Sequence, residues 1–278
     1  MSAEVVWEGT TDNSWDTASN WSDGDVPEAS DNVQIPAGSP DITSGLNQSA
    51  IALGSVWISS GYTGQIGDIS SPYQPEYLQL DCDLFRCDGA CTAYVKFAHP
   101  SGTTPVIVSN SASPNTGKYA VNLCSSGNIN LDIRGGYVGL AYFISDTLAA
   151  VDLTVSAGVV HIGKNSTSSD VNITGGIVDM YGDQSSATGW TIENGTVNLR
   201  EWKAAYAINM YNGILNADHW STSPSAINVY GGQCVLDNGV DRTLASLKVD
   251  GGTVSLDPGI VTVSTLNVPG QRRSISAI

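Results

Sequence analysis

The side chains that could carry chemistry in this chain are few and widely spaced. The three histidines, His99, His161 and His219, are 62 and 58 residues apart, so their spacing does not indicate a shared metal site. Three of the five cysteines follow the pattern C-x4-C-x3-C, without the paired C-x2-C or histidine units of a zinc site. We therefore expect no metal and no cofactor. We interpret the cysteines as small apolar wall residues, kept reduced in a cytosol: Cys82, Cys87, Cys91, Cys124 and Cys234.

The carboxylates also fail to form a catalytic pattern. A glycosidase needs two of them at a fixed separation across a groove. In the repeat described below, Asp179 is expected to lie between His161 on one side and Asn198 and Asn216 on the other, which indicates a solvated polar ladder. There is no G-x-S-x-G motif and no phosphate loop. The acidic N-terminal residues Asp12, Asp16, Asp23 and Asp25 could bind calcium, but their order matches no known calcium loop, so ordinary turn chemistry is favoured.

These side chains are positioned by an internal repeat that begins near residue 130. Seven nine-residue segments align without gaps, from "DIRGGYVGL" at Asp132 to "KVDGGTVSL" at Lys248, and their starts are 18 to 22 residues apart. Apolar residues occupy the second, seventh and ninth positions of every segment. Such a period is typical of stacked repeats. The fifth position is always glycine, and we expect these glycines to form coil corners: Gly136, Gly158, Gly176, Gly195, Gly213, Gly232 and Gly252.

Two architectures could produce this repeat. Each segment could be a β-hairpin, since Gly-Gly or Asn-Gly between alternating apolar residues is a strong hairpin signal. Alternatively, each segment is the bend between two strands of one coil in a parallel β-helix. The coil explains more, because equivalent side chains then stack in columns, such as Ile173 over Ile192. Less regular coils are expected upstream, from Val56 onward. We predict an all-β chain folded as a right-handed parallel β-helix over residues 45–268.

The N-terminal strip is rich in tryptophan. Trp7, Trp15 and Trp21 are three of the seven tryptophans in the chain. A β-helix exposes unpaired strand edges and apolar wall at its ends, so we predict that residues 1–44 form a cap plugged by these rings. The alternative is that exposed rings stack on sugars. Residues 269–278 are predicted to be a C-terminal tail, in which Arg272 and Arg273 form the only basic doublet and could dock on an acidic partner.

Charge and composition exclude several classes of function. The net charge is −16, and residues 1–100 carry fourteen acidic side chains against two basic ones. A surface of this kind repels phosphate backbones, so nucleic acid is not an expected partner. No run of 18 apolar residues is present, so no membrane partner is expected. The first residues contain no basic region followed by an apolar core, so no secretion signal is predicted.

The N-terminal strip resembles the opening of many bacterial and phage β-helical proteins. The resemblance is carried by Trp7-x-Gly9, Trp15 and "ASNWSDGDVPEASDNVQI", residues 18–35. Residues 46–67, "LNQSAIALGSVWISSGYTGQIG", look like the next element of phage virion proteins of this type. The resemblance covers about the first 70 residues, while the later repeats match only the general β-helix style. It implies a right-handed β-helix, a homotrimer and a place on the outside of a virus particle, and it brings no catalytic residues.

Several β-helix families act on acidic polysaccharides, and their motifs are absent here. Polygalacturonase-like enzymes carry Gly-His-Gly and Arg-x-Lys elements, which this sequence lacks. Pectate-lyase-like enzymes need a basic residue near calcium-binding carboxylates. The basic candidates, Arg134, Lys164, Arg200 and Lys203, have no acidic cluster at a neighbouring register. We therefore predict a protein that is not an enzyme.

The sequence is best explained as a bacteriophage capsid decoration or cement protein. It would assemble in the host cytoplasm and join the virion exterior, where its partner is the major capsid protein or another decoration protein. A carbohydrate-binding or polysaccharide-degrading β-helix, such as a short tailspike, is the alternative. A bacterial surface adhesin was also considered, but the absence of a predicted secretion signal counts against it.

Overall fold

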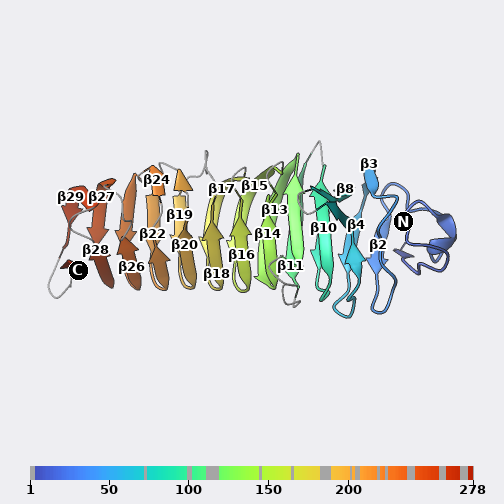
Figure 1. The fold of residues 1–278 in the computed structure, drawn as a ribbon, viewed down its shortest axis with the longest axis horizontal. Coiled ribbons are helices and arrows are strands. Elements are labelled where there is room, and N and C mark those ends of the chain that lie inside the picture. Colours follow the sequence, from blue (N-terminus) through green and yellow to red (C-terminus); the bar gives the residue numbers. More distant parts are fainter. Residues whose placement is uncertain are drawn as a thin grey trace. The chain divides into compact units, whose positions relative to one another are not determined.

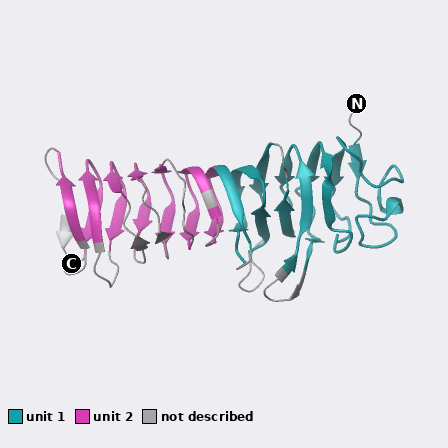
Figure 2. Cartoon of the chain, turned by 90° about the horizontal axis from the view of Figure 1, so that it is seen from above, with its two compact units in different colours: residues 1–151 teal, residues 152–278 magenta. Residues whose placement is uncertain are grey.

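The computed structural model describes residues 4–71, 74–98, 102–110, 119–143, 146–163, 166–181, 189–200, 202–203, 207–217, 220–222, 225–236, 242–256, 261–269 and 275–277. The chain divides into two compact units, residues 1–151 and 152–278 (Figure 2). Within each unit, parallel strands lie side by side in successive coils (Figure 1). This arrangement is the right-handed parallel β-helix that the sequence predicts, and it excludes the hairpin array.

Unit 1 contains two parallel sheets. One has the strand order β1-β2-β4-β9-β11-β13 and the other β3-β8-β10-β12-β14. β5 pairs with β10, and β6 pairs with β7 in a small antiparallel ribbon. The elements are β1 (Glu4–Val6), η1 (Ala18–Asn20), β2 (Asn32–Ile35), β3 (Asn47–Leu53), β4 (Ser55–Ile58), β5 (Gln65–Ile66), β6 (Asp68–Ser71), β7 (Gln74–Glu76), β8 (Leu78–Cys82), β9 (Phe85–Cys87), β10 (Thr92–Phe97), β11 (Thr103–Ser109), β12 (Val121–Ser125), β13 (Asn128–Gly135) and β14 (Tyr137–Leu140).

Unit 2 is the more regular of the two. Its sheets have the orders β17-β19-β22-β25-β27-β29 and β16-β18-β20-β23-β26-β28-β30, and β21 pairs with β24. β15 (Leu148–Val155) contains the division between the units. The other strands are β16 (Val159–Ile162), β17 (Ser166–Ile173), β18 (Ile177–Met180), β19 (Gly189–Ile192), β20 (Thr196–Leu199), β21 (Trp202–Lys203), β22 (Ala207–Met210), β23 (Ile214–Asn216), β24 (Trp220–Thr222), β25 (Ala226–Val229), β26 (Gln233–Leu236), β27 (Arg242–Val249), β28 (Thr253–Leu256), β29 (Val261–Asn267) and β30 (Ile275–Ala277).

The core of unit 2 consists of internal columns. The second repeat position gives a fully buried column in which each residue pairs in register with the next: Ile173, Ile192, Met210, Val229 and Val249. The seventh position gives another buried column: Val160, Val178, Val197, Leu215, Cys234 and Val254. Burial of the apolar side chains in both columns contributes favourable free energy to the fold.

The glycine corners of unit 2 stack directly on one another. The carbonyl oxygen of Gly195 accepts a hydrogen bond from the Ile214 amide at 2.8 Å, and the same contact recurs at the corners of Gly158, Gly176, Gly213 and Gly232. A Cβ at Gly213 would lie only 2.4 Å from this oxygen of Gly195. The corner therefore excludes a side chain for two reasons, the positive φ of +84° and the close approach of the preceding coil.

Strand pairing continues into both predicted end segments. Residues 1–44, the predicted cap, contain β1 and β2, which pair in parallel with each other, and β2 pairs with β4. The cap therefore includes the first strands of the β-helix. At the other end, β30 pairs with β28 through Val254 and Ile275, so part of the predicted tail extends the sheet. Arg272 and Arg273 lie outside the described residues.

Candidate functional site

The three N-terminal tryptophans form one buried aromatic cluster. Trp7 and Trp15 are fully buried, and Trp21 is 2% exposed. The Trp21 ring packs edge-on against the other two, at centroid distances of 5.0 Å to Trp7 and 4.7 Å to Trp15. The indole N–H of Trp7 donates to the Pro40 carbonyl at 3.0 Å, and that of Trp21 donates to the Trp15 carbonyl at 2.8 Å. These rings present no open face on which a sugar could stack.

Asn20 organises the loop around this aromatic cluster, which the sequence analysis did not anticipate. Its side chain is fully buried. Its amide oxygen accepts from the backbone N–H groups of Thr11 and Asp12 at 2.8 and 3.2 Å. Its amide nitrogen donates to the Asp12 carboxylate at 2.7 Å and to the Ser14 carbonyl at 2.9 Å. In the sequence, Asn20 is marked only by its position between Trp15 and Trp21. Its hydrogen bonds form only once the loop is folded.

Three of the four acidic residues for which turn chemistry is predicted, Asp12, Asp16 and Asp23, accept hydrogen bonds through their carboxylates. The Asp12 carboxylate accepts hydrogen bonds from the Ser14 amide and from Asn20 and Thr17, and these lower the pKa of Asp12. The Asp16 carboxylate accepts from the Gln48 amide at 2.7 Å. Asp23 accepts from the backbone N–H of Asp25 at 3.2 Å. Among the described residues, no group of three or more potential metal ligands was found.

The polar ladder of unit 2 lies where the sequence predicted it. His161 on β16 is in register with Asp179 on β18, which is followed by Asn198 on β20 and Asn216 on β23. The Asn198 amide donates to the Asp179 carboxylate at 2.8 Å, and the Asn216 amide donates to the Asn198 oxygen at 2.8 Å. Side chains in this ladder are therefore bound to one another along the coil axis.

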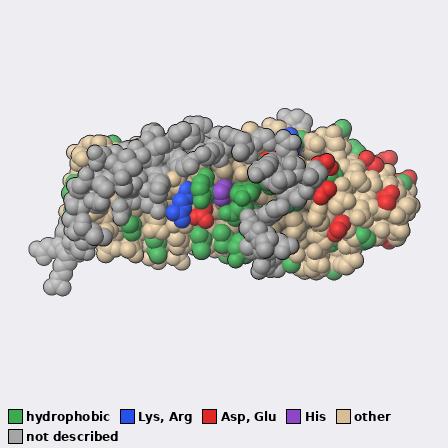
Figure 3. Space-filling view, viewed as in Figure 1, with side chains coloured by type: hydrophobic (Ala, Val, Ile, Leu, Met, Phe, Trp, Pro, Cys, Tyr) green, Lys and Arg blue, Asp and Glu red, His purple; other side chains and the backbone are tan. Residues whose placement is uncertain are grey.

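Two further side chains extend this ladder. The Tyr181 ring stacks on His161, with centroids 4.5 Å apart and an angle of 18° between the ring planes. The Arg200 guanidinium lies 3.8 Å from the Asp179 carboxylate. Figure 3 shows histidine, basic and acidic side chains side by side among hydrophobic ones, and the described histidine is His161. We call His161, Asp179, Tyr181, Asn198, Arg200 and Asn216 the polar ladder face.

The chemistry available to the polar ladder face is limited. Burial lowers the pKa of His161 to about 4, and the nearby Asp179 carboxylate only partly opposes this. The imidazole is therefore neutral at pH 7. Among the described residues of this face, Asp179 is the one carboxylate. The face can donate and accept hydrogen bonds and offer an aromatic surface, which are the properties of a binding or scaffolding surface.

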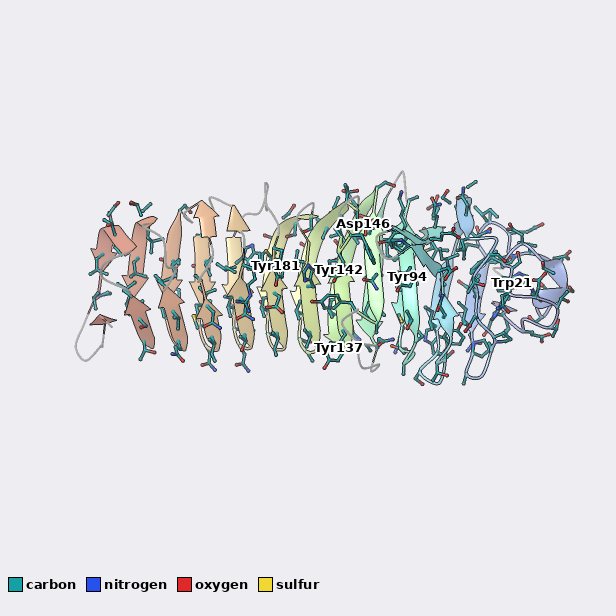
Figure 4. All side chains as sticks on the ribbon, viewed as in Figure 1. Trp21, Tyr94, Tyr137, Tyr142, Asp146 and Tyr181 are labelled. Carbon is teal, nitrogen blue, oxygen red and sulfur yellow. The ribbon has the colours of Figure 1, made fainter. Side chains whose placement is uncertain are left out.

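A second polar cluster, in unit 1, was missed by the sequence analysis. The hydroxyl of Tyr77 donates a hydrogen bond to the Asp146 carboxylate, which also accepts from the Phe143 amide at 3.2 Å. The Tyr94 ring packs near both Tyr77 and Phe143, at centroid distances of 6.3 and 6.4 Å. Tyr94 and Asp146 are labelled in Figure 4. Asp146 is 7% exposed, and burial raises its pKa. Burial also raises the pKa of Cys124, to about 12.

The remaining candidates carry no visible site. Arg134 binds its neighbour Asp132 through two contacts of 2.8 and 2.6 Å. Lys203 lies in β21, but its side chain is not described, and Lys164, His99 and His219 lie outside the described residues. All five cysteines are buried and free.

Comparisons with family models, with curated proteins and with solved structures found no match to this chain. In the described part of the chain, no helix is long and apolar enough to span a membrane.

Proposed function

We propose that the chain is a structural protein of a bacteriophage particle, a decoration or cement protein that acts as a trimer and bridges capsid subunits from outside. The observation that carries this proposal is the pairing of outward polar side chains with one another. Asn198 binds Asp179, Asn216 binds Asn198, and on the other sheet Asn228 binds Asn209 at 2.9 Å. Side chains held in this way stiffen the coils.

The N-terminal cap supports the same role. The residues that resemble phage β-helical proteins, Trp7, Trp15 and Trp21, are packed against one another inside the cap. A closed end covers apolar wall that would otherwise promote aggregation of free chains before assembly. A scaffold that must persist outside a cell benefits from both features, since neither depends on a ligand.

The test uses virus particles produced from the genome that encodes this chain. Purified particles are analysed by quantitative mass spectrometry, and we expect the chain in a fixed ratio to the major capsid protein. Particles from a genome in which this gene is deleted should still assemble and should rupture at a lower temperature. Absence of the chain from purified particles would refute the proposal.

The alternative is a carbohydrate-binding or polysaccharide-degrading β-helix, such as a short tailspike. The observation in its favour is the stacked pair His161 and Tyr181 beside Asp179 and Arg200, since aromatic rings with nearby hydrogen-bonding groups suit sugars. Host surface polysaccharide is incubated with the protein, and binding and chain length are measured. Tyr181→Ala should abolish any binding, whereas Tyr211→Ala, at the separate stacked pair of Tyr211 and Tyr230, should not. Intact, unbound polysaccharide would exclude this alternative.

A further inference from the structure

Two buried cysteines meet at one corner of unit 1. β9 ends at Cys87 and β10 begins directly after Cys91, so both thiols flank a turn of three residues. Their sulfur atoms are 3.8 Å apart, and the residues are 0% and 1% exposed. This pair is unlike Cys234, which lies in an apolar column of unit 2. A disulfide holds its two sulfurs at about 2.05 Å, so these sulfurs must move closer together for the bond to form.

The turn between the two thiols is fixed from inside the coil. Asn110 is fully buried, and its amide donates to the carbonyls of Gly89 and Cys91, the latter at 3.2 Å. The same amide nitrogen lies 3.9 Å from the sulfur of Cys87 and 3.7 Å from that of Cys91. One side chain therefore holds the turn backbone and touches both sulfurs.

The same turn is also fixed from outside. The Asp88 carboxylate accepts hydrogen bonds from the Arg86 guanidinium at 2.5 Å and from the Trp57 indole at 3.0 Å. A Cβ at Gly89 would lie 2.8 Å from the Tyr62 carbonyl oxygen, so the turn packs closely on the preceding coil. Because both sides of the turn are anchored, the sulfurs cannot easily move apart. The folded chain therefore holds the pair ready for a bond between them.

We propose that Cys87 and Cys91 are a redox pair that closes into an intrachain disulfide when the chain meets a disulfide oxidant such as oxidised glutathione. One cysteine thiolate attacks a sulfur of the oxidant and releases one glutathione thiolate. The second cysteine thiolate then attacks the protein sulfur of this mixed disulfide and releases the other. Two electrons pass to the oxidant, and the two thiol protons end on the two molecules of reduced glutathione. The corner is thereby covalently closed.

Burial controls when this reaction occurs. The contact between the two thiols and their burial raise the pKa of Cys87, so little thiolate exists in the folded chain. Oxidation of the folded protein should therefore be slow. It should be faster during folding in the same redox buffer, when the thiols are still open to solvent. The folded geometry then determines how much disulfide remains at equilibrium.

The experiment uses the full chain refolded in a glutathione redox buffer, then alkylated under denaturing conditions and digested with trypsin. Cleavage after Arg86 and Lys96 gives one peptide, residues 87–96, that contains both cysteines and no other. We expect this peptide to be unalkylated and about 2 Da lighter than its reduced form, because two hydrogens are lost. The ratio of intrachain disulfide to mixed disulfide with glutathione should be roughly tenfold higher in the refolded chain than in the same chain held in urea.

Two variants complete the test. Cys234→Ala removes a buried cysteine that has no part in the corner, and peptide 87–96 should still be oxidised. Cys91→Ala should leave Cys87 alkylated or joined to glutathione. Two alkylated thiols in peptide 87–96 of the refolded protein, or equal oxidation in the folded and urea-unfolded chains, would overturn the proposal. The comparison with urea needs no variant, so it decides the question even if Cys91→Ala fails to fold.

Discussion

At the scale of single residues, His161 couples the polar ladder face to pH. Its pKa falls to about 4 in the folded chain, from a usual value of 6.5, because burial disfavours the charged ring. The unfolded chain therefore binds more protons between these values, and stability must decrease as the pH falls from 6.5 to 4. Since the side chain is only partly buried, we expect a loss of about 2 kcal/mol over this range.

The variant His161→Asn isolates this effect. Asparagine continues the amide ladder of Asn198 and Asn216, and it does not titrate. Urea unfolding at pH 7, 5.5 and 4 should show a shallower pH dependence for the variant than for the natural chain. Parallel pH profiles for the two proteins would show that His161 does not titrate as its burial implies.

The Tyr77 hydroxyl is expected to stabilise a buried carboxylate. In Tyr77→Phe, Asp146 loses its hydroxyl donor, so the free energy of unfolding should decrease by about 1–3 kcal/mol at pH 7. Burial raises the pKa of Asp146, so its ionisation destabilises the fold as the pH rises above 3.8. The Tyr77 hydrogen bond opposes this rise in the pKa of Asp146, because it favours the ionised carboxylate. The loss caused by Tyr77→Phe should therefore be smaller at low pH, where Asp146 is protonated. Tyr211→Phe, at a tyrosine that is 53% exposed, serves as the control and should change stability little.

At the scale of elements, the glycine corner sets the stacking of coils. Gly136 has a φ of +84°, and a Cβ there would lie 2.0 Å from the Asn110 carbonyl oxygen. Its neighbour Gly135 would meet the same oxygen at 3.8 Å, an ordinary contact. Gly136→Ala should therefore cost about 3 kcal/mol or more, whereas Gly135→Ala should change stability by less than about 1 kcal/mol. Chemical denaturation of both variants checks this, and equal losses would contradict the role of the corner.

The same elements show what sequence can and cannot predict. The spacing of Gly176, Gly195 and Gly213 predicted the coils of unit 2, because each corner must repeat where the backbone turns onto the preceding corner. It also placed His161 beside Asp179. In unit 1 the coil length varies, so the sequence contains no regular repeat from which the strand register could be predicted. Contacts between side chains distant in sequence therefore could not be predicted either.

The sites that were missed depend on this irregular register. The Tyr77 and Asp146 pair joins residues 69 positions apart. Cys87 and Cys91 are close in sequence, but the contact of their sulfurs depends on Asn110, which belongs to a later segment. The pairing of β30 with β28 was also not predicted, because β30 lies beyond the last glycine repeat.

At the scale of the whole molecule, charge is concentrated in the N-terminal part of the sequence. Fourteen of the 27 acidic residues lie within the first 100 positions, with only two basic residues. Acidic side chains are also evident on the surface of unit 1 in Figure 3. Copies of this chain therefore repel one another at long range, and any association between them must depend on ionic strength.

This repulsion gives a test of the proposed trimer. At 0.15 M salt the screening length is about 8 Å, and we expect sedimentation equilibrium to give three times the 29.0 kDa chain mass. At 0.01 M salt the screening length grows to about 30 Å, so the subunits should repel one another more strongly. The trimer should then begin to dissociate at a higher protein concentration than it does at 0.15 M salt. The double variant Asp23→Asn and Asp25→Asn removes two exposed charges and should reduce this salt dependence. A mass of 29.0 kDa under all of these conditions would exclude a stable trimer in solution.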